Sequence, residues 1–388
     1  MKKILFITPR NPYSDISGGT IVTKTAIEML SNKFCLDLFY LELNCNTDII
    51  KNDKVHKIYK INHKIKSKNL LTIISELFST LPLSIYRNNS KFIKDKLATI
   101  IYDYDVVYVD HWLMMQFIPQ NFKGDVLLRE HNAEYKMWER YFNNCNSLIK
   151  KIYLKYEISK IKKYECEICN RATKVLVLSE EDKNNLYKIG VKLSKLIFLP
   201  AIVVPSDKLV TKNFKNKENA LLYIGTFAWE ANVDGLDYFL KNIYPKVKER
   251  VKNVKFYIVG KNPPQKLLDY SLNDSSIVFT GFVENLSEIY NKAKIFITYL
   301  RFGSGIKIKI LEALSNGLPV VANDIGLEGI DTNATMEGKS DSDFAMHIVH
   351  LLKDYNLLDS MSVIAINYMK DNYSETKFQN VINSIIQN

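Results

Sequence analysis

The segment from Tyr299 to Val321 contains the residues whose types and spacing best suit a chemical role. An apolar run typical of a strand leads into Gly303-Ser304-Gly305, and the apolar spacing of a helix follows. Glycines let backbone N–H groups approach a ligand closely, and a helix N-terminus carries about half a positive charge. The pattern therefore predicts an anion-binding site, reinforced by nearby cations: Arg301, Lys307 and Lys309.

Lys309 and Glu312 are three residues apart, so they lie on one face of the predicted helix. A cation suited to phosphate beside a carboxylate suited to hydroxyl groups is a sensible pair for binding a nucleotide diphosphate. An ordinary ion pair on a surface helix is the alternative for these two residues alone. The adjoining Gly-Ser-Gly turn favours the ligand site.

Polar residues also follow strand patterns in the first half of the chain. Gly18 and Gly19 separate the first apolar run from a helix pattern, and Asp110-His111 ends a later strand. The segment 129–134, Arg-Glu-His-Asn-Ala-Glu, follows the strand predicted over Asp125–Leu128. Ligands bind at the carboxyl ends of strands in open parallel sheets, so these residues are site candidates. A simple turn for the glycines and structural roles for the histidines are the alternatives.

Two sequence patterns resemble metal sites, and their context argues against both. Asp103-Tyr104-Asp105 has Asp-x-Asp spacing, but Asp105 leads into a strand, whereas metal-binding carboxylates of this type follow one. Cys166-x-x-Cys169 has no second cysteine pair and no nearby histidine, and zinc requires four ligands. We expect core packing for these cysteines and no metal or other cofactor.

The predicted elements are those of a two-domain α/β protein. Strands alternate with glycine loops and helices in both halves of the chain, as in parallel sheets, and 388 residues suit two domains. Leu199–Pro205 and the polar run Lys212–Asn219 predict a linker. We expect two doubly wound Rossmann-like domains facing a central cleft, over residues 1–203 and 204–371. The last helix, about residues 372–388, is expected to pack back on the first domain.

The net charge of +11 belongs entirely to the first half, where residues 1–200 hold 32 Lys and Arg against 21 Asp and Glu. The excess is densest over Lys51–Lys68, with seven lysines and one aspartate, and the apolar stretch Leu70–Leu83 follows. A basic segment beside an apolar helix can bind an anionic membrane. A solvated face beside a core helix is the alternative. No nucleic-acid-binding module is recognised, so nucleic acid is not an expected partner.

No apolar run approaches the ~18 residues of a membrane span, and the N-terminal run is too short for a signal peptide. We expect a cytoplasmic protein that is at most peripheral on the inner face of the cell membrane.

The second half resembles the nucleotide-binding domain of retaining GT-B glycosyltransferases, the group 1 family of bacterial polysaccharide and lipopolysaccharide type. The resemblance covers about residues 220–330 closely and the N-terminal half loosely. It rests on segments in the family's order and spacing: Tyr223–Phe227, Ile258–Gly260, Phe279–Val283, the Lys309–Glu312 helix and Gly317–Val321. The resemblance implies that Glu312 binds ribose hydroxyls, that Gly18-Gly19 is the family's glycine loop, and that His131 lies at the cleft.

Two positions depart from the family pattern. Ser304 stands where the family has a glutamate that commonly contacts the donor sugar. The segment Trp229–Gly235 replaces the usual Arg and Lys after the domain's first strand, and it resembles a subgroup with Asn-x-Asp-Gly. The groups that stabilise the negative charge of the leaving group would then be Arg301, Lys307, Lys309 and the amides of the glycine loop.

The residues and the resemblance together give three groups of candidates. The donor-binding candidates are Gly18, Gly19, Gly225, Thr226, Gly303, Ser304, Gly305, Ile306, Lys307 and Glu312. The catalytic candidates are His131, Lys309 and Arg301. The acceptor-side candidates are Asp110, His111, Asn132 and Glu134.

We therefore expect a retaining, metal-independent glycosyltransferase that moves a sugar from a nucleotide-diphosphate donor to a glycan or lipid-linked acceptor in surface polysaccharide synthesis. The nucleotide sugar would be a substrate and not a cofactor. Two alternatives stay open. One is a GT-B-fold sugar-nucleotide epimerase or phosphorylase, and the other is a non-catalytic GT-B partner protein.

Overall fold

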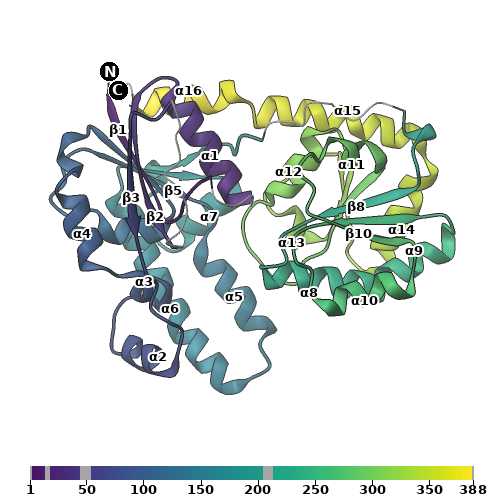
Figure 1. The fold of residues 1–388 in the computed structure, drawn as a ribbon, viewed down its shortest axis with the longest axis horizontal. Coiled ribbons are helices and arrows are strands. Elements are labelled where there is room, and N and C mark those ends of the chain that lie inside the picture. Colours follow the sequence, from purple (N-terminus) through teal and green to yellow (C-terminus); the bar gives the residue numbers. More distant parts are fainter. Residues whose placement is uncertain (1, 14–17, 44–53, 204–212, 387–388) are drawn as a thin grey trace. The chain divides into compact units, whose positions relative to one another are not determined.

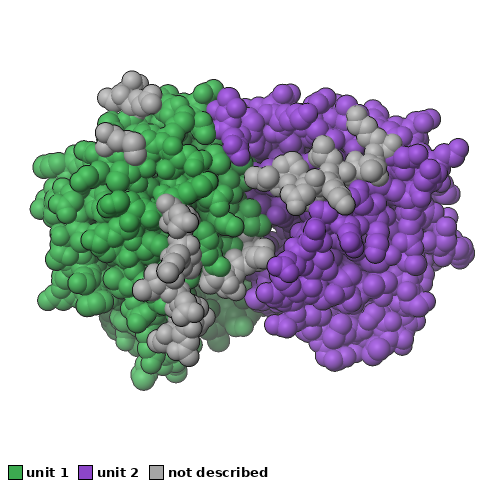
Figure 2. All heavy atoms as spheres, turned by 45° about the horizontal axis from the view of Figure 1, so that its top comes forward, with its two compact units in different colours: residues 1–202, 378–388 green, residues 203–377 purple. Residues whose placement is uncertain are grey.

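The computed structural model describes residues 2–13, 18–43, 54–203 and 213–386 (Figure 1). The chain divides into two compact units, Met1–Ile202 with Phe378–Asn388 (unit 1) and Val203–Lys377 (unit 2), which Figure 2 distinguishes by colour. Much of the predicted linker, residues 204–212, and the start of the basic segment, residues 51–53, lie outside the described residues.

Unit 1 is built on a seven-stranded parallel sheet in the order β3-β2-β1-β4-β5-β6-β7. Strands buried on both faces appear in a sequence as nearly continuous apolar runs, which is why most of them are predictable. The strands are β1 (Lys3–Thr8), β2 (Cys35–Glu42), β3 (Lys57–Asn62), β4 (Val106–Asp110), β5 (Asp125–Glu130), β6 (Lys174–Val177) and β7 (Leu196–Phe198).

Helices cover both faces of this sheet. They are α1 (Gly18–Ser31), α2 (Leu70–Leu77), α3 (Leu83–Asn88), α4 (Lys91–Ala98), α5 (Glu134–Asn144), α6 (Leu148–Arg171), α7 (Glu180–Lys188) and α16 (Glu375–Ile386), with short 3-10 turns η1 (Ile101–Asp103), η2 (Trp112–Phe117) and η3 (Leu193–Lys195). The side chain of Ser147 accepts a hydrogen bond from the Lys150 N–H and caps the start of α6.

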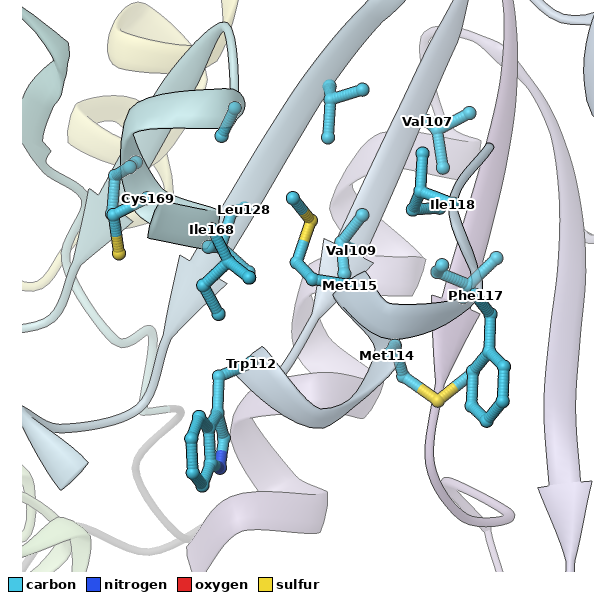
Figure 3. Close-up of a cluster of buried hydrophobic side chains, with 14 of the residues drawn as sticks. Val107, Val109, Trp112, Met114, Met115, Phe117, Ile118, Leu128, Ile168 and Cys169 are labelled. Carbon is cyan, nitrogen blue, oxygen red and sulfur yellow. The ribbon is translucent and has the colours of Figure 1, made fainter. Parts of the chain in front are cut away.

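The core of unit 1 has two layers, because successive residues of a strand point to opposite faces of the sheet. Ile4 and Phe6 of β1 pack with residues of α1 and α16, and Leu5 and Ile7 pack on the other face. Figure 3 shows part of this second layer, where Val109 of β4, Leu128 of β5, Met115 of η2 and Ile168 of α6 lie together. This packing fixes the end of β4, which carries Asp110.

Unit 2 is built on a six-stranded parallel sheet in the order β10-β9-β8-β11-β12-β13. Its strands are β8 (Ala220–Ile224), β9 (Lys255–Val259), β10 (Ile277–Gly281), β11 (Ile295–Thr298), β12 (Val320–Ala322) and β13 (Thr335–Glu337). Its helices are η4 (Phe214–Asn216), α8 (Glu230–Tyr238), η5 (Phe239–Ile243), α9 (Tyr244–Arg250), α10 (Gln265–Asn273), α11 (Ser287–Lys292), α12 (Ile308–Ser315), α13 (Asp324–Leu327), α14 (Asp341–Lys353) and α15 (Tyr355–Asn372). The predicted doubly wound α/β architecture is confirmed in both units.

The apolar spacing over Val233–Val251 is that of one continuous helix, but the structure interrupts it. A π-helical segment, η5, separates α8 from α9. Pro245 lies in the first turn of α9 and has no N–H to donate to the preceding turn, so the regular helix cannot run through it.

An aromatic cluster joins the core of unit 2 to the loop after β11. Phe239 lies 5.3 Å from Phe256 and 5.7 Å from Phe344, measured between ring centres. Tyr299, the first residue after β11, lies 5.8 Å from Phe344. The beginning of this loop is therefore anchored in the core. No helix in the described part of the chain is both long enough and apolar enough to cross a membrane.

Candidate active site

The predicted residues of unit 2 lie where the strand order of its sheet reverses. β8 pairs with β9 on one side and with β11 on the other, so chain connections leave in opposite directions beside it. Ligands of open α/β sheets bind at the carboxyl ends of strands at such a point. Gly225 and Thr226 follow β8, and the loop 299–307 follows β11.

The loop after β11 has a backbone that requires its glycines. Gly303 and Gly305 have φ angles of 136° and 75°, in the left-handed region that favours glycine. The side chain of Asn323 accepts a hydrogen bond from the backbone N–H of Leu300 at 3.1 Å and donates one to the carbonyl oxygen of Leu300 at 2.6 Å. The loop leads directly into α12, whose first backbone N–H groups have no partner within the helix.

Lys309 is a partly buried cation that no carboxylate balances. Its Nζ donates to Oδ1 of Asn232 at 3.0 Å and to the hydroxyl of Tyr223 at 3.4 Å, and it lies 4.5 Å from the centre of the Tyr223 ring. Among the described residues, no carboxylate forms an ion pair with it. Burial, together with the charge of Lys307, lowers the pKa of Lys309 to about 7. A bound anion would favour its charged form.

Glu312, on the same helix face as Lys309, is a carboxylate that no cation balances among the described residues. Burial raises the pKa of its carboxyl group to about 7. Its carboxylate makes no hydrogen bond or ion pair with any residue that the structure describes, Lys309 included. The ordinary i, i+3 ion pair, which was the alternative for these two residues, is therefore not formed.

Arg301 and Lys307 have carboxylate partners. Arg301 makes a forked contact with Asp234. Lys307 is buried, donates to the carbonyl oxygen of Gly305, and lies 3.5 Å from Glu328. Their charges are partly balanced within the protein, so Lys309 is the cation at this site that gains most from an incoming anion.

Three residues of the Asn-x-Asp-Gly motif hold this site together, and the sequence did not assign them a role. Asn232 contacts Lys309 and donates to the carbonyl oxygen of Thr226 at 2.9 Å, and Asp234 contacts Arg301. At Gly235, a Cβ atom would lie 2.0 Å from the carbonyl oxygen of Tyr299, so only glycine fits. The motif itself, placed directly after β8, was the signal that could have identified them.

The predicted residues of unit 1 gather at the equivalent reversal, between β1 and β4. Asp110 ends β4 and is buried. Its Oδ1 accepts hydrogen bonds from Nε of Arg129 at 2.7 Å and from Nε2 of His131 at 2.8 Å, and its Oδ2 accepts one from Thr23 at 2.5 Å. Burial opposes ionisation, but Arg129 and His131 outweigh it and hold the pKa of Asp110 well below its usual range. The Asp110 carboxylate therefore has ionic partners within unit 1.

His131 is oriented by this network. Because an ionised Asp110 only accepts hydrogen bonds, Nε2 of His131 carries the proton of this contact, which fixes the orientation of the ring. The Nδ1 atom faces the start of α1, where a Cβ atom added to Gly19 would lie 3.9 Å from it. The His131 side chain is 19% exposed, so a ligand can reach it.

His111 has an unusual backbone beside this network. Its φ angle is 99°, which is strained for a residue other than glycine, and such strain concentrates at functional sites. Its Nδ1 accepts a hydrogen bond from the N–H of Leu113 at 3.3 Å, and its ring centre lies 5.6 Å from that of His131. Burial and nearby cations, with His131 the largest, lower its pKa to about 3. His111 is therefore a neutral imidazole near pH 7.

Asn132 and Glu134 lie at the start of α5. Nδ2 of Asn132 is 3.5 Å from Oε2 of Glu134, and Nε1 of Trp138 donates to Oε1 of Glu134 at 3.4 Å. Burial raises the pKa of Glu134. The carboxylate of Glu165 on α6 accepts the backbone N–H groups of Glu134 and Tyr135 and so fixes the beginning of α5.

The Asp-x-Asp pattern is part of the framework. Oδ2 of Asp105 accepts a hydrogen bond from the backbone N–H of Lys3 at 2.8 Å, which fastens β1 beside β4. Within the ranges that the structure describes, no group of three or more His, Cys, Asp or Glu side chains is arranged to hold a metal ion.

Comparisons with known proteins agree with the family resemblance. Residues 218–354 match the model of the family described as Glycosyl transferases group 1. A protein of Klebsiella pneumoniae, described as "Uncharacterized 44.6 kDa protein in cps region", is 27% identical over 393 residues, which cover 97% of this chain and 98% of that protein.

Solved structures share the fold over the whole chain. Sucrose-phosphate synthase from Thermosynechococcus elongatus has a TM-score of 0.71 and 16% identity, covering 100% of this chain and 98% of that one. A mutant of S. aureus TarM, in complex with Fondaparinux, alpha-GlcNAc-glycerol and UDP, has a TM-score of 0.71 and 15% identity, covering 99% and 100%. The predicted GT-B fold is thereby confirmed. The chain therefore has the GT-B fold, and residues 218–354 within it are similar to the family described as Glycosyl transferases group 1.

Proposed function

We propose that the protein is a retaining, metal-independent glycosyltransferase that transfers a sugar from a nucleotide-diphosphate donor to a glycan or lipid-linked acceptor in surface polysaccharide synthesis. One observation carries the proposal: Lys309 and Glu312 share a helix face at the sheet's reversal point, and neither has an ionic partner among the described residues. The similar protein from a cps region and the UDP complex of the similar TarM mutant support it.

In this proposal the donor binds along the loop 299–307 and the beginning of α12. Backbone N–H groups and Lys309 hold the diphosphate, because a helix N-terminus and an ammonium group both favour phosphate oxygens. Glu312 accepts hydrogen bonds from the ribose hydroxyls. Gly225, Thr226, Ser304 and Ile306 line the path of the donor, and Asn232 keeps Lys309 in place.

The reaction then depends on positive charge at the leaving diphosphate and on a positioned histidine. Lys309, the loop amides and Arg301 stabilise the leaving group as the sugar–oxygen bond breaks. His131 hydrogen-bonds the donor sugar or stabilises charge at the reacting carbon, while Asp110 holds its ring. We assign no protein nucleophile, because the acceptor attacks on the face that the diphosphate leaves, and the diphosphate takes the acceptor's proton.

The central test removes the two helix residues. We expect Lys309→Ala and Glu312→Ala each to lower sugar-nucleotide turnover by about 100-fold or more, since each removes a charged hydrogen-bonding group. Lys246→Ala and Glu249→Ala are matched controls, because they form another Lys/Glu pair with i, i+3 spacing, on α9 of the same unit. Circular dichroism melting checks folding. Wild-type turnover in both test variants would rule out the donor site.

The type of reaction is tested on the wild-type protein. Turnover that persists in excess EDTA is expected for a metal-independent enzyme, and the anomeric configuration of the product distinguishes retention from inversion. Formation of a new sugar nucleotide without acceptor would identify an epimerase, and phosphate-dependent release of a sugar phosphate would identify a phosphorylase. Nucleotide binding without any sugar release would identify a non-catalytic partner protein.

We further propose that the basic first half attracts the protein to an anionic membrane on its cytoplasmic face, where a lipid-linked acceptor would be found. Lys64, Lys66 and Lys68 of the basic segment are exposed, as this requires. Electrostatic attraction of this kind weakens with salt, because ions screen exposed charges within about 10 Å at 0.1 M. Vesicle binding that does not change at high salt would contradict it.

A further inference from the structure

Two neighbouring helices of unit 1 expose apolar faces. The exposed fractions run from 42% to 90% over α2 and the residue that follows it, and from 44% to 82% over the start of α6. The exposed side chains are Leu70, Leu71, Ile74, Leu77 and Phe78 on the first, and Leu148, Ile149, Ile152 and Tyr156 on the second. Each set has the spacing of one helix face. Single exposed apolar residues are ordinary, but a contiguous group marks an interaction surface.

Polar contacts hold these two faces side by side. The hydroxyl of Tyr153 donates to Oε2 of Glu76 at 3.2 Å, and the hydroxyl of Tyr156 donates to the carbonyl oxygen of Leu77 at 3.1 Å. Lys160 forms a buried ion pair with Glu76. We call residues 70–78 and 148–156 the α2–α6 tip. Figure 1 shows α2 and the beginning of α6 at the end of unit 1 that lies away from its sheet.

The exposed charge around the tip is of one sign. Lys64, Lys66 and Lys68 precede α2, and Lys150 and Lys155 lie among the apolar residues of α6, all of them exposed. The acidic residues of segments 64–83 and 147–160 are Glu76 and Glu157, and both are buried. Glu76 pairs with Lys160, and Glu157 accepts the backbone N–H of Leu83. The tip therefore combines an apolar surface with lysines and no exposed carboxylate.

We propose that the α2–α6 tip inserts into the headgroup region of an anionic lipid bilayer. Amphipathic helices bind in this way, with apolar side chains about 5–10 Å deep and lysines reaching the anionic headgroups. Two copies of the tip facing each other would bring their lysines together, which opposes self-association. Interfaces with other proteins are depleted of lysine, so the composition of the tip favours lipid.

The tip is connected through α6 to the acceptor-side candidates. Ile152 lies in the tip, and Glu165, thirteen residues later on the same helix, fixes the start of α5 at Glu134. At 1.5 Å per residue, these two positions are about 20 Å apart along α6. A tip held in the bilayer would therefore keep the acceptor-side residues about 20 Å from it, within reach of the headgroup of a lipid-linked acceptor. This part rests on the proposed function.

Flotation with vesicles tests the proposal on the full-length protein. The probes are vesicles of phosphatidylcholine alone and of phosphatidylcholine with phosphatidylglycerol. We expect a triple variant, Phe78→Ser with Ile149→Ser and Ile152→Ser, to bind the anionic vesicles at least about 100-fold more weakly. The matched control is Leu193→Ser with Leu272→Ser and Met346→Ser, which changes exposed apolar residues elsewhere and should bind as the wild type does.

A charge variant separates the two contributions. Lys68→Gln with Lys150→Gln and Lys155→Gln should weaken binding to anionic vesicles by about fivefold per lysine and leave binding to phosphatidylcholine alone unchanged. Lys241→Gln with Lys252→Gln, exposed lysines of unit 2, is its control. UDP binding, measured in solution without vesicles, should be the same in every variant.

Three results would overturn the proposal. The first is a wild type that does not bind anionic vesicles, and the second is a triple variant that binds them as tightly as the wild type. The third is wild-type self-association without lipid that the triple variant abolishes, which would make the tip a contact between copies. Failure of UDP binding or turnover in the wild type would instead contradict the proposed transferase function and leave the vesicle result valid.

Discussion

Unit 1 and unit 2 place polar residues at the same point of the same sheet topology, and the two sets differ in how their charges are balanced. In unit 1, Asp110 is buried with Arg129 and His131 as partners, and its pKa lies well below the usual range. In unit 2, burial shifts the pKa of both Lys309 and Glu312 to about 7, and neither contacts the other as an ion pair.

Asp110 has ionic partners within unit 1, whereas Lys309 and Glu312 have none among the described residues of unit 2. Breaking a buried, paired charge leaves its partner uncompensated, so removal of one member of the unit 1 network should destabilise the fold. Unpaired groups with shifted pKa values lower stability, and they are typical of sites that bind a charged ligand. Under the proposed function, unit 1 would be a rigid frame for His131, and unit 2 would carry the anion-binding site.

The largest expected effect comes from opening the unit 1 network. Asp110→Ala leaves the buried Arg129 without a counter-charge, and we expect a loss of about 3–5 kcal/mol in the free energy of unfolding. Lys309→Ala should lower it by less than about 1 kcal/mol, because no ion pair is broken. Denaturant unfolding of both variants checks the comparison, and equal losses would contradict it.

The next effect separates positioning from donor binding. His131→Ala should lower turnover by about 100-fold, as removal of one polar group aimed at the reacting atoms does. Its affinity for UDP should stay within about twofold of the wild type, because no Lys309 or Glu312 contact changes. Steady-state kinetics and calorimetric titration measure the two quantities. A large loss of UDP affinity would place His131 in the nucleotide site instead.

A smaller effect concerns protons. At pH 8 the pKa of about 7 leaves most Lys309 side chains neutral, and a bound diphosphate favours the charged form. UDP binding at pH 8 should therefore take up about one proton or less, and affinity should fall as the pH rises above 7. Titration in buffers with different ionisation enthalpies measures the uptake. Uptake that persists unchanged in Lys309→Met would assign it to another group.

The smallest effect is on thermal stability. The pKa of Glu312 is raised from 4.5 to about 7 in the folded protein, so its stabilising contribution is present below about pH 4.5 and is lost as the pH rises through 7. In Glu312→Gln the side chain does not ionise, so the variant does not lose this stability as the pH rises. We expect its melting temperature to exceed that of the wild type by roughly 2–4 °C at pH 8 and to match it at pH 4.5. A lower melting temperature at pH 8 would contradict this.

The sequence predicted the strands and glycine loops well because parallel strands buried on both faces appear as short apolar runs. β4 and β8 are of this kind; β4 ends at the predicted residue Asp110, and Gly225 and Thr226 follow β8. The strand β3 was not predicted, because it pairs with one neighbour only and its sequence, Lys-Ile-Tyr-Lys-Ile-Asn, is part of a basic segment.

The sequence could not predict which cations at the site have carboxylate partners, because these partners are distant along the chain. Arg301 contacts Asp234, which is 67 residues away, and Lys307 lies beside Glu328. Nothing in the local sequence shows that these cations are balanced and that Lys309 is not. The spacing of Lys309 and Glu312 gave their shared face, but their shifted pKa values come from burial in the folded protein.

The most direct test of the account asks whether Lys309 recognises the diphosphate. Calorimetric titration would compare UDP and uridine on the wild type and on Lys309→Met, which gives a double-mutant cycle between the residue and the ligand group. If Lys309 binds the diphosphate, UDP loses about 30–100-fold in affinity in the variant while uridine loses less than twofold, a coupling of about 2 kcal/mol. Equal losses for UDP and uridine, or none for either, would contradict the placement of the diphosphate at the beginning of α12.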